Sequence, residues 1–241
     1  MAEAPGNPPD RKLSGELPSS PGAPPMKLLL VASDSREFRG IRPRTPTRGK
    51  HQMVLTANGA GAHWAAAAVD AALATFQPDA IVSVGFCGAL APDLAIADIV
   101  VGTTVFADGR AFAAQTPTAG RPHQLGPVCC LDHVAQTAAE KAELRTTGAL
   151  AVEMEAAGVA ERAQALGLPF FCIKAVTDLA GETMANDFNA ALRSDGRFDT
   201  IRLLASSLGH PWVRLPELFR LRARCIRAAR SLGDFIADCR F

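Results

Sequence analysis

Short segments that are apolar throughout alternate along the chain with longer segments in which apolar residues recur at helical spacing. Strands are expected at 28–32, 52–57, 80–84, 99–106 and 170–176. Helices are expected at 62–76, 133–144 and 153–167, the last of them ending at Gly167. Strands without an exposed polar face are typical of a sheet that is covered on both sides. The pattern therefore predicts an α/β fold.

The two ends of the chain differ from this core in composition. Residues 1–25 contain seven prolines, which predicts a disordered tail, or an upstream extension with Met26 as the true start. Residues 211–241 contain seven arginines against three acidic residues, and apolar residues follow helical spacing after Pro216, a residue that suits a helix start. We expect a domain over 26–210, with a long loop at 108–127, and a basic amphipathic helix over 211–241.

Composition excludes several classes of protein. The chain has 241 residues, 48% of them hydrophobic, and a net charge of +1, which argues against a disordered chain and against a nucleic-acid partner. It contains no apolar run of the roughly 20 residues that a membrane span needs, and its start does not resemble a signal peptide. Its six cysteines form no CxxC pair, which favours reduced, buried thiols in a cytoplasmic protein and predicts no metal site.

Candidate chemistry lies where the predicted strands end, because ligands of open α/β sheets bind at the carboxyl ends of strands. Taken singly, each polar group there is also explained by a turn or a helix cap. Glu153 and Glu155 are less easily explained, since they flank Met154 at the head of an Ala-rich helix and capping accounts for only one of them. A carboxylate that faces a cleft there would suit the binding of sugar hydroxyls.

Four motifs stand in order along the chain: the opening strand and loop Met26–Glu37, the glycine-rich strand Val84–Leu90 with Asp98–Val101 after it, the segment Val152–Ala156, and the strand end Lys174–Asp178. Together they resemble the motifs of the nucleoside phosphorylase and methylthioadenosine/S-adenosylhomocysteine nucleosidase superfamily, over a stretch from about residue 27 to 210. The resemblance implies a single-domain, three-layer αβα sandwich around a twisted, mixed and mostly parallel sheet. It also implies an enzyme that cleaves the N-glycosidic bond of a purine nucleoside.

The resemblance assigns a role to each matching residue. Asp178 would be the general acid that protonates N7 of the leaving purine, Glu37 would orient the attacking water, and Glu155 would bind the ribose hydroxyls. Such an aspartic acid must keep its proton near neutral pH, which requires a pocket poor in water. Lys174 lies inside an apolar strand and is expected to need a buried carboxylate partner. The remaining substrate-binding residues would be Phe86, Cys87, Gly88, Glu153, Met154 and Thr177.

Departures from the family pattern bear on the choice between hydrolysis and phosphorolysis. The resemblance places a phosphate-binding arginine of the hexameric phosphorylases at the position of Ser83, whose hydroxyl cannot replace its charge. This favours hydrolysis slightly. Arg36, Arg39 and Arg42 lie beside the same loop as Glu37, however, and are candidates for a phosphate site. No cofactor is expected, with inorganic phosphate as co-substrate if the enzyme is a phosphorylase.

The resemblance favours a 5′-substituted adenosine as substrate, from which adenine is released. The tail also resembles that of the hopanoid-associated phosphorylases, which suggests an adenosyl-lipid as an alternative substrate. An enzyme that acts on such a lipid is expected to contact the inner membrane peripherally through residues 216–238. The resemblance further implies a homodimer. A purine-binding protein without catalysis is the alternative from another class, although the presence of Asp178, Glu155 and Glu37 argues against it.

Overall fold

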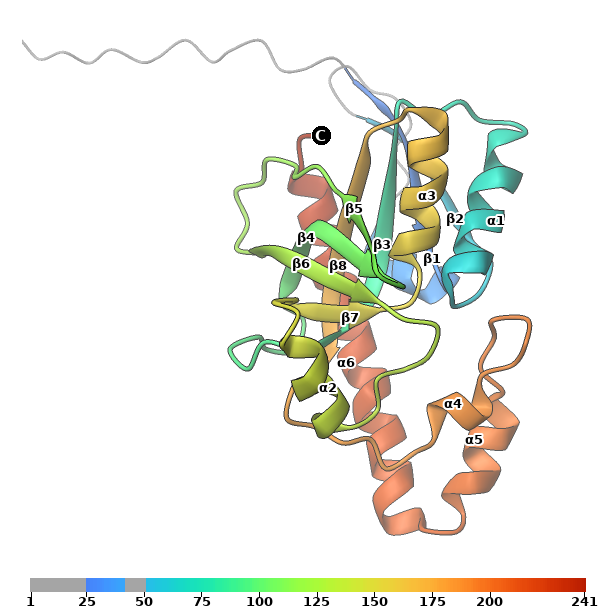
Figure 1. The fold of residues 1–241 in the computed structure, drawn as a ribbon. Helices are drawn as coiled ribbons and strands as arrows, with labels where there is room; N and C mark the ends of the chain where they lie inside the picture. Colours follow the sequence, from blue (N-terminus) through green and yellow to red (C-terminus); the bar gives the residue numbers. More distant parts are fainter. Residues whose placement is uncertain (1–24, 42–50) are drawn as a thin grey trace, which may run out of the picture.

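In the computed structural model, which describes residues 25–41 and 51–241, helices cover both faces of one eight-stranded sheet (Figure 1). The strands follow the order β2-β1-β3-β7-β6-β4-β5, and β8 pairs with both β3 and β4. Pairing is parallel except between β3 and β7, β4 and β5, and β4 and β8. The strands are β1 (Lys27–Ala32), β2 (Gln52–Ala57), β3 (Ala80–Ala89), β4 (Ile99–Ala107), β5 (Arg110–Ala113), β6 (Gln124–Cys130), β7 (Ala151–Glu153) and β8 (Phe170–Asp178).

The helices form the two outer layers. α1 (Ala62–Leu73) and α3 (Ala156–Leu166) lie against one face of the sheet. The C-terminal half of α6 (Pro211–Asp238) covers the other face, together with the 3₁₀ helix η1 (Ser35–Gly40). The shorter helices are α2 (Ala138–Arg145), α4 (Phe188–Ala191) and α5 (Thr200–Ser207). The three-layer α/β fold with a mixed, mostly parallel sheet is confirmed.

The first strand shows why the strand segments are apolar throughout. Leu29 and Val31 belong to the hydrophobic cluster beneath α1 and α3. The alternate residues Leu28, Leu30 and Ala32 belong to a second cluster, which contains the buried face of α6. Because successive side chains of a strand point to opposite faces, a strand between two helical layers needs apolar residues at both phases.

The structure corrects the predicted loop at 108–127. This segment contains β5 and the beginning of β6. Asp108 and Gly109 both have positive φ, 49° and 72°, and join β4 to β5 as a two-residue hairpin turn. An Asp-Gly pair is a strong hairpin signal because such turns place both central residues at positive φ. The sequence therefore contained the information that the prediction of a loop overlooked.

Three helix starts also differ from the predictions. α2 begins at Ala138, five residues late, after Thr137 caps it by accepting from the backbone N–H of Glu140. α3 begins at Ala156, because the preceding residues form β7. α6 begins at Pro211, so that Pro216 lies inside the helix and not at its start.

The predicted disordered tail lies, apart from Pro25, outside the described residues, as does Arg42. Among the residues that the structure describes, none of the helices combines the length and apolar character needed to cross a bilayer.

Candidate active site

The predicted site residues converge at the carboxyl end of β3. β1, β3 and β8 are parallel, so the residues that follow each of them lie at one edge of the sheet. Gly88 is paired with Asp178 of β8 on one side and with Val152 of β7 on the other. This register brings the loop after β1, the glycine-rich end of β3 and the head of α3 together.

Glu37 reaches this edge from η1. Its side chain is buried, and its Oε1 accepts a hydrogen bond from the hydroxyl of Ser33. Its Oε2 is buried without a hydrogen-bond partner among the described residues. Gly85 makes room for it: φ is +140° there, and a Cβ atom would collide with Glu37 Oε2. Burial and the nearby charge of Glu155 raise the pKa of Glu37 to about 8.

Lys174 and Glu153 form an ion pair at the centre of the protein. Lys174 Nζ lies 2.7 Å from Glu153 Oε2, and both side chains are fully buried. The oxygens of Glu153 also accept from the backbone N–H groups of Glu155 and Ala156 at the start of α3. The expected buried partner of Lys174 is thus confirmed. With these contacts, the geometry favours a structural role for Glu153 over the predicted contact with substrate.

Glu155 lies beside this pair, and its carboxylate makes fewer close polar contacts than that of Glu153. Its Oε1 accepts from the backbone N–H of Gly61 at 3.1 Å, and its Oε2 lies 3.9 Å from Lys174 Nζ. Burial raises the pKa of Glu155 to about 7, although Lys174 opposes the rise. Burial by itself would lower the pKa of Lys174. The charges of Glu153 and Glu155 outweigh this effect and hold the pKa above its usual value.

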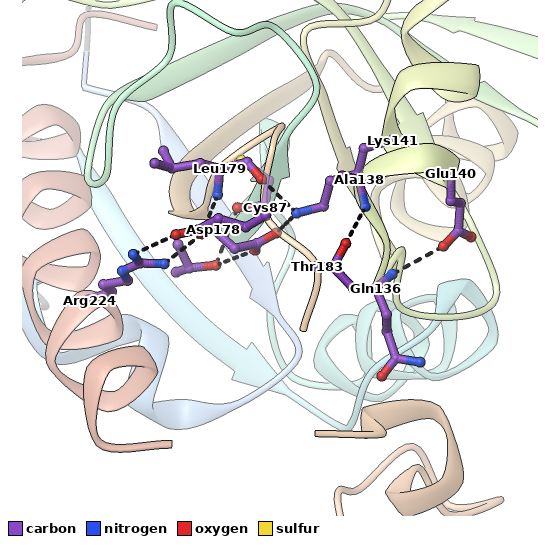
Figure 2. A network of polar contacts seen from close by, with 11 residues as sticks. Cys87, Gln136, Ala138, Glu140, Lys141, Asp178, Leu179, Thr183 and Arg224 are labelled. Carbon is purple, nitrogen blue, oxygen red and sulfur yellow. Dashed lines mark hydrogen bonds and ion pairs between the residues drawn. The ribbon is translucent and has the colours of Figure 1, made fainter. Parts of the chain in front are cut away.

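Asp178 is paired with a lysine that sequence analysis missed. Lys141 Nζ donates to Asp178 Oδ1 and also to the carbonyl of Leu179 at 2.9 Å (Figure 2). The side chain of Lys141 is fully buried although it extends from the short, polar helix α2. Burial raises the pKa of Asp178, and the ammonium of Lys141 limits the rise. Nothing in the sequence around Lys141 distinguishes it from a solvated helix residue.

The remaining predicted residues surround these carboxyl groups. The hydroxyl of Thr177 lies 3.2 Å from Asp178 Oδ2 and 3.3 Å from the carbonyl oxygen of Cys87. Cys87, Gly88 and Met154 are buried, and Phe86 is half-buried. The structure therefore places them close to the same edge.

A cavity of about 180 Å³ lies between Asp178 and the first half of α6. Arg224 donates to both carboxylate oxygens of Glu182 at its rim, at 2.7 and 2.8 Å (Figure 2). The lining residues are Asp178, Glu182, Thr183, Met184, Phe188, Glu217, Arg220, Leu221 and Arg224. Glu37 and Glu155 are not among them, so the cavity extends away from Asp178 on the side of α6.

The structure gives little support to the arginines that are candidates for binding phosphate. Arg36 is largely exposed and donates to both oxygens of Asp34 on the same loop, at 2.9 and 2.8 Å. Arg39 is also exposed. Ser83 is fully buried in β3 and offers no positive charge. Among the described residues, no cluster of His, Cys, Asp and Glu is arranged to hold a metal ion.

Comparison with known proteins adds an independent observation. The profile of a family described as the phosphorylase superfamily matches residues 27–119 and 110–198, which is well over half of the chain. The chain belongs to the phosphorylase superfamily. The matched segments contain every strand of the sheet and all three carboxyl groups, Glu37, Glu155 and Asp178.

Curated relatives in this superfamily include nucleosidases. The 5′-methylthioadenosine/S-adenosylhomocysteine nucleosidase of Shewanella piezotolerans is 28% identical over 203 residues, which cover 72% of this chain and 88% of that protein. Its counterpart from Chromohalobacter salexigens is 28% identical over 169 residues, covering 58% and 72%. The chain is thus an enzyme of the superfamily.

Solved structures share the fold. The nucleosidase of the same name from Helicobacter pylori superposes with a TM-score of 0.62 at 14% identity, over 88% of this chain and 97% of that one. The futalosine hydrolase of Helicobacter pylori superposes with a TM-score of 0.61 at 14% identity, over 88% and 96%. At this level of identity, the likeness is one of fold alone.

The buried ion pair predicts a large effect on stability. Lys174→Met leaves Glu153 charged and buried without its partner, and we expect the free energy of unfolding to fall by about 3–5 kcal/mol. Urea unfolding of Lys174→Met and of the unchanged protein measures this difference in the free energy of unfolding. In the double variant Lys174→Met/Glu153→Gln, the loss should be smaller than the sum of the two single losses. Strictly additive losses would show that the two side chains do not interact in this way.

The raised pKa of Glu37 predicts a pH-dependent stability. The carboxyl binds its proton more tightly in the folded protein than in the unfolded chain, where the pKa is near 4.5. Its contribution is therefore fully present below about pH 4.5 and is lost as the pH rises through about 8. We expect Glu37→Gln to flatten the fall in unfolding free energy between about pH 5 and pH 8. Glu143→Gln, on the exposed face of α2, is the matched control and should leave the slope unchanged.

Proposed function

We propose that this enzyme hydrolyses the N-glycosidic bond of a purine nucleoside and releases the free base. The observation that carries the proposal is the meeting of three buried carboxyl groups, Glu37, Glu155 and Asp178, at the carboxyl end of β3. A structural explanation accounts for Glu153, which starts a helix and neutralises Lys174, but not for Glu37, whose Oε2 has no hydrogen-bond partner among the described residues, or for Glu155, whose Oε2 lies 3.9 Å from Lys174 Nζ. Buried acids with raised pKa values are typical of sites that transfer protons.

Asp178 would supply the proton that makes the base a good leaving group. A purine leaves more readily when N7 is protonated, because the electrons of the breaking bond then neutralise a positive ring. Burial keeps the pKa of Asp178 raised, as a general acid near neutral pH requires. Thr177 holds Oδ2, which leaves the carboxyl group in a fixed orientation beside Cys87 and Gly88.

Glu155 and Glu37 would act on the sugar and on the water. Glu155 binds two neighbouring hydroxyls of the ribose through its carboxylate, which lies at the head of α3. Glu37 has one oxygen held by Ser33 and the other without a partner among the described residues, which suits orientation of a water molecule. Its pKa of about 8 lies close to the working pH of a general base.

Lys141 would act as a positioning residue through Asp178. After proton transfer, Asp178 is a carboxylate in a buried site, where an unpaired charge is costly. The ammonium of Lys141 stabilises this carboxylate, and so strengthens the acid while fixing its Oδ1 (Figure 2). The ion pair with Lys141 therefore counteracts the rise that burial causes in the pKa of Asp178.

Water is the favoured nucleophile, and a 5′-substituted adenosine is the favoured substrate. Ser83 lacks the charge that phosphate requires, and Arg36 is occupied by Asp34. Relatives named as nucleosidases of methylthioadenosine and S-adenosylhomocysteine support adenine as the base. An adenosyl-lipid is a second candidate substrate, favoured by the apolar side chains that are exposed on α6, the helix that also supplies lining residues of the cavity.

Base release decides between these possibilities. The purified protein is incubated with methylthioadenosine, S-adenosylhomocysteine, adenosine, inosine and an adenosyl-lipid, each with and without phosphate, and the products are separated by chromatography. Adenine in phosphate-free buffer is the expected result. Release only with phosphate would replace hydrolysis by phosphorolysis. Purine binding without any base release would replace the enzyme by a binding protein.

Replacement of the general acid should separate binding from turnover. We expect Asp178→Asn to lower kcat by about 10²–10⁴-fold while purine binding is retained, because the amide has no proton to give at this pH. Asp93→Asn, an exposed acid beyond the end of β3, is the control and should keep normal activity. Near-normal turnover by Asp178→Asn would remove Asp178 from the acid role.

Replacement of Lys141 should move the pH profile. Lys141→Met removes the cation that holds down the pKa of Asp178, so the alkaline limb of kcat/KM should shift to higher pH, and kcat should fall. Lys141→Arg keeps the charge and should restore the limb. A folded Lys141→Met protein with an unshifted limb would show that the lysine does not act through Asp178.

A further inference from the structure

Exposed apolar side chains gather on one helical hairpin. Of the nine large hydrophobic residues exposed in the described part of the chain, seven lie on the segment 198–219. Trp212 is 91% exposed and Ile201 is 81% exposed. The seven are Phe198, Ile201, Leu204, Leu208, Trp212, Val213 and Phe219. A concentration of exposed apolar side chains of this kind indicates a site of interaction. We call residues 198–222, which comprise α5 and the first half of α6, the α5–α6 hairpin.

The exposed apolar face of the hairpin is not the face that holds it to the protein. Leu203 and Ser207 of α5 are buried, and Leu203 packs with Phe188 of α4. Ile201, Leu204 and Leu208 follow at spacings of three and four, and so lie together on the other side of the helix. Folding of the hairpin therefore explains one apolar face and leaves the second without a partner.

The same segment is strongly basic. Residues 197–227 contain seven arginines and two acidic residues, an excess of five positive charges. Both acids are already engaged with the backbone: Asp199 caps α5, and Glu217 accepts from the backbone N–H groups of Ala185 and Asn186. Arg224 is paired with Glu182, so the other six arginines carry the positive charge of a segment that also exposes apolar side chains.

The hairpin also forms a wall of the candidate active site. Arg220 and Leu221 of the hairpin line the cavity that Asp178 also lines. Figure 1 shows α5 and the beginning of α6 projecting away from the sheet. A surface bound by the hairpin would therefore lie next to the cavity.

We propose that the α5–α6 hairpin docks the enzyme on an anionic lipid bilayer. Trp212, Ile201 and the neighbouring apolar side chains enter the boundary between headgroups and acyl chains, where tryptophan is favoured. The arginines contact lipid phosphates, and their charge complements that of an anionic membrane. The contact surface overlaps the predicted segment 216–238 only over residues 216–222, because the apolar face of the C-terminal half of α6 packs against the sheet.

Co-sedimentation with vesicles tests the proposal without reference to activity. The full chain should bind vesicles of phosphatidylcholine with phosphatidylglycerol and bind phosphatidylcholine alone at least about tenfold more weakly. Ile201→Ser/Trp212→Ser should weaken binding to the anionic vesicles about tenfold or more. Leu125→Ser/Leu166→Ser removes the two exposed apolar side chains on β6 and α3 and is the matched control, which should bind normally.

Two further readouts make the result specific. Trp212 and Trp64 are the two tryptophans of the chain, so in Trp64→Phe the emission of Trp212 alone should shift to the blue when anionic vesicles are added. Arg222→Glu should weaken vesicle binding, since it reverses a charge on the hairpin.

Three outcomes would overturn the proposal. The first is equal binding of the full chain to neutral and anionic vesicles, and the second is equal vesicle binding by the Ile201→Ser/Trp212→Ser variant and the control. The third is that the full chain does not bind vesicles but forms a dimer in sedimentation velocity, and that Ile201→Ser/Trp212→Ser converts this dimer to a monomer. The last would assign the surface to a second copy of this chain. Release of base from a soluble nucleoside by the same variants reports separately on the proposed function and on correct folding.

Discussion

The ion pair between Lys174 and Glu153 is the interaction on which the rest of the site depends. An ammonium group in the middle of a fully buried strand is tolerated only with a carboxylate beside it, and Glu153 supplies one at 2.7 Å. The same carboxylate accepts the first backbone N–H groups of α3. One side chain thus fixes β8, β7 and the start of α3 relative to each other, and so fixes where Glu155 lies.

Around this pair, burial rather than any single contact sets the chemistry. Glu37, Glu155 and Asp178 all lie where water is excluded, and burial is the largest cause of the raised pKa of each. The cations differ in what they do. Lys174 has its own carboxylate and only moderates Glu155, whereas Lys141 contacts Asp178 directly. Lys174 therefore helps to position the head of α3, and Lys141 limits the rise in the pKa of Asp178.

α6 connects this site to the surface. Its C-terminal half packs on the sheet through Leu232 and Ile236, and its first half leaves the sheet to form the cavity wall and the α5–α6 hairpin. A single helix therefore has a structural end and an interacting end. Pro216 lies inside the first half, in the second turn, where it removes one backbone N–H from the helix.

The sequence by itself determined the layers of this protein and the residues near its site, and the tertiary structure decided their partners. Apolar strands such as Leu28–Ala32 indicate a covered sheet because both of their faces are buried, and motifs that resemble those of the superfamily predict Glu37, Glu155 and Asp178 as site residues. Local signals such as Asp108-Gly109 were present but overlooked. Lys141 could not be found in this way, since it contacts a residue 37 positions away and its own helix is polar. The contact surface on α5 and α6 was equally hidden, because helical spacing shows that a face is apolar but only packing shows which apolar face is left uncovered.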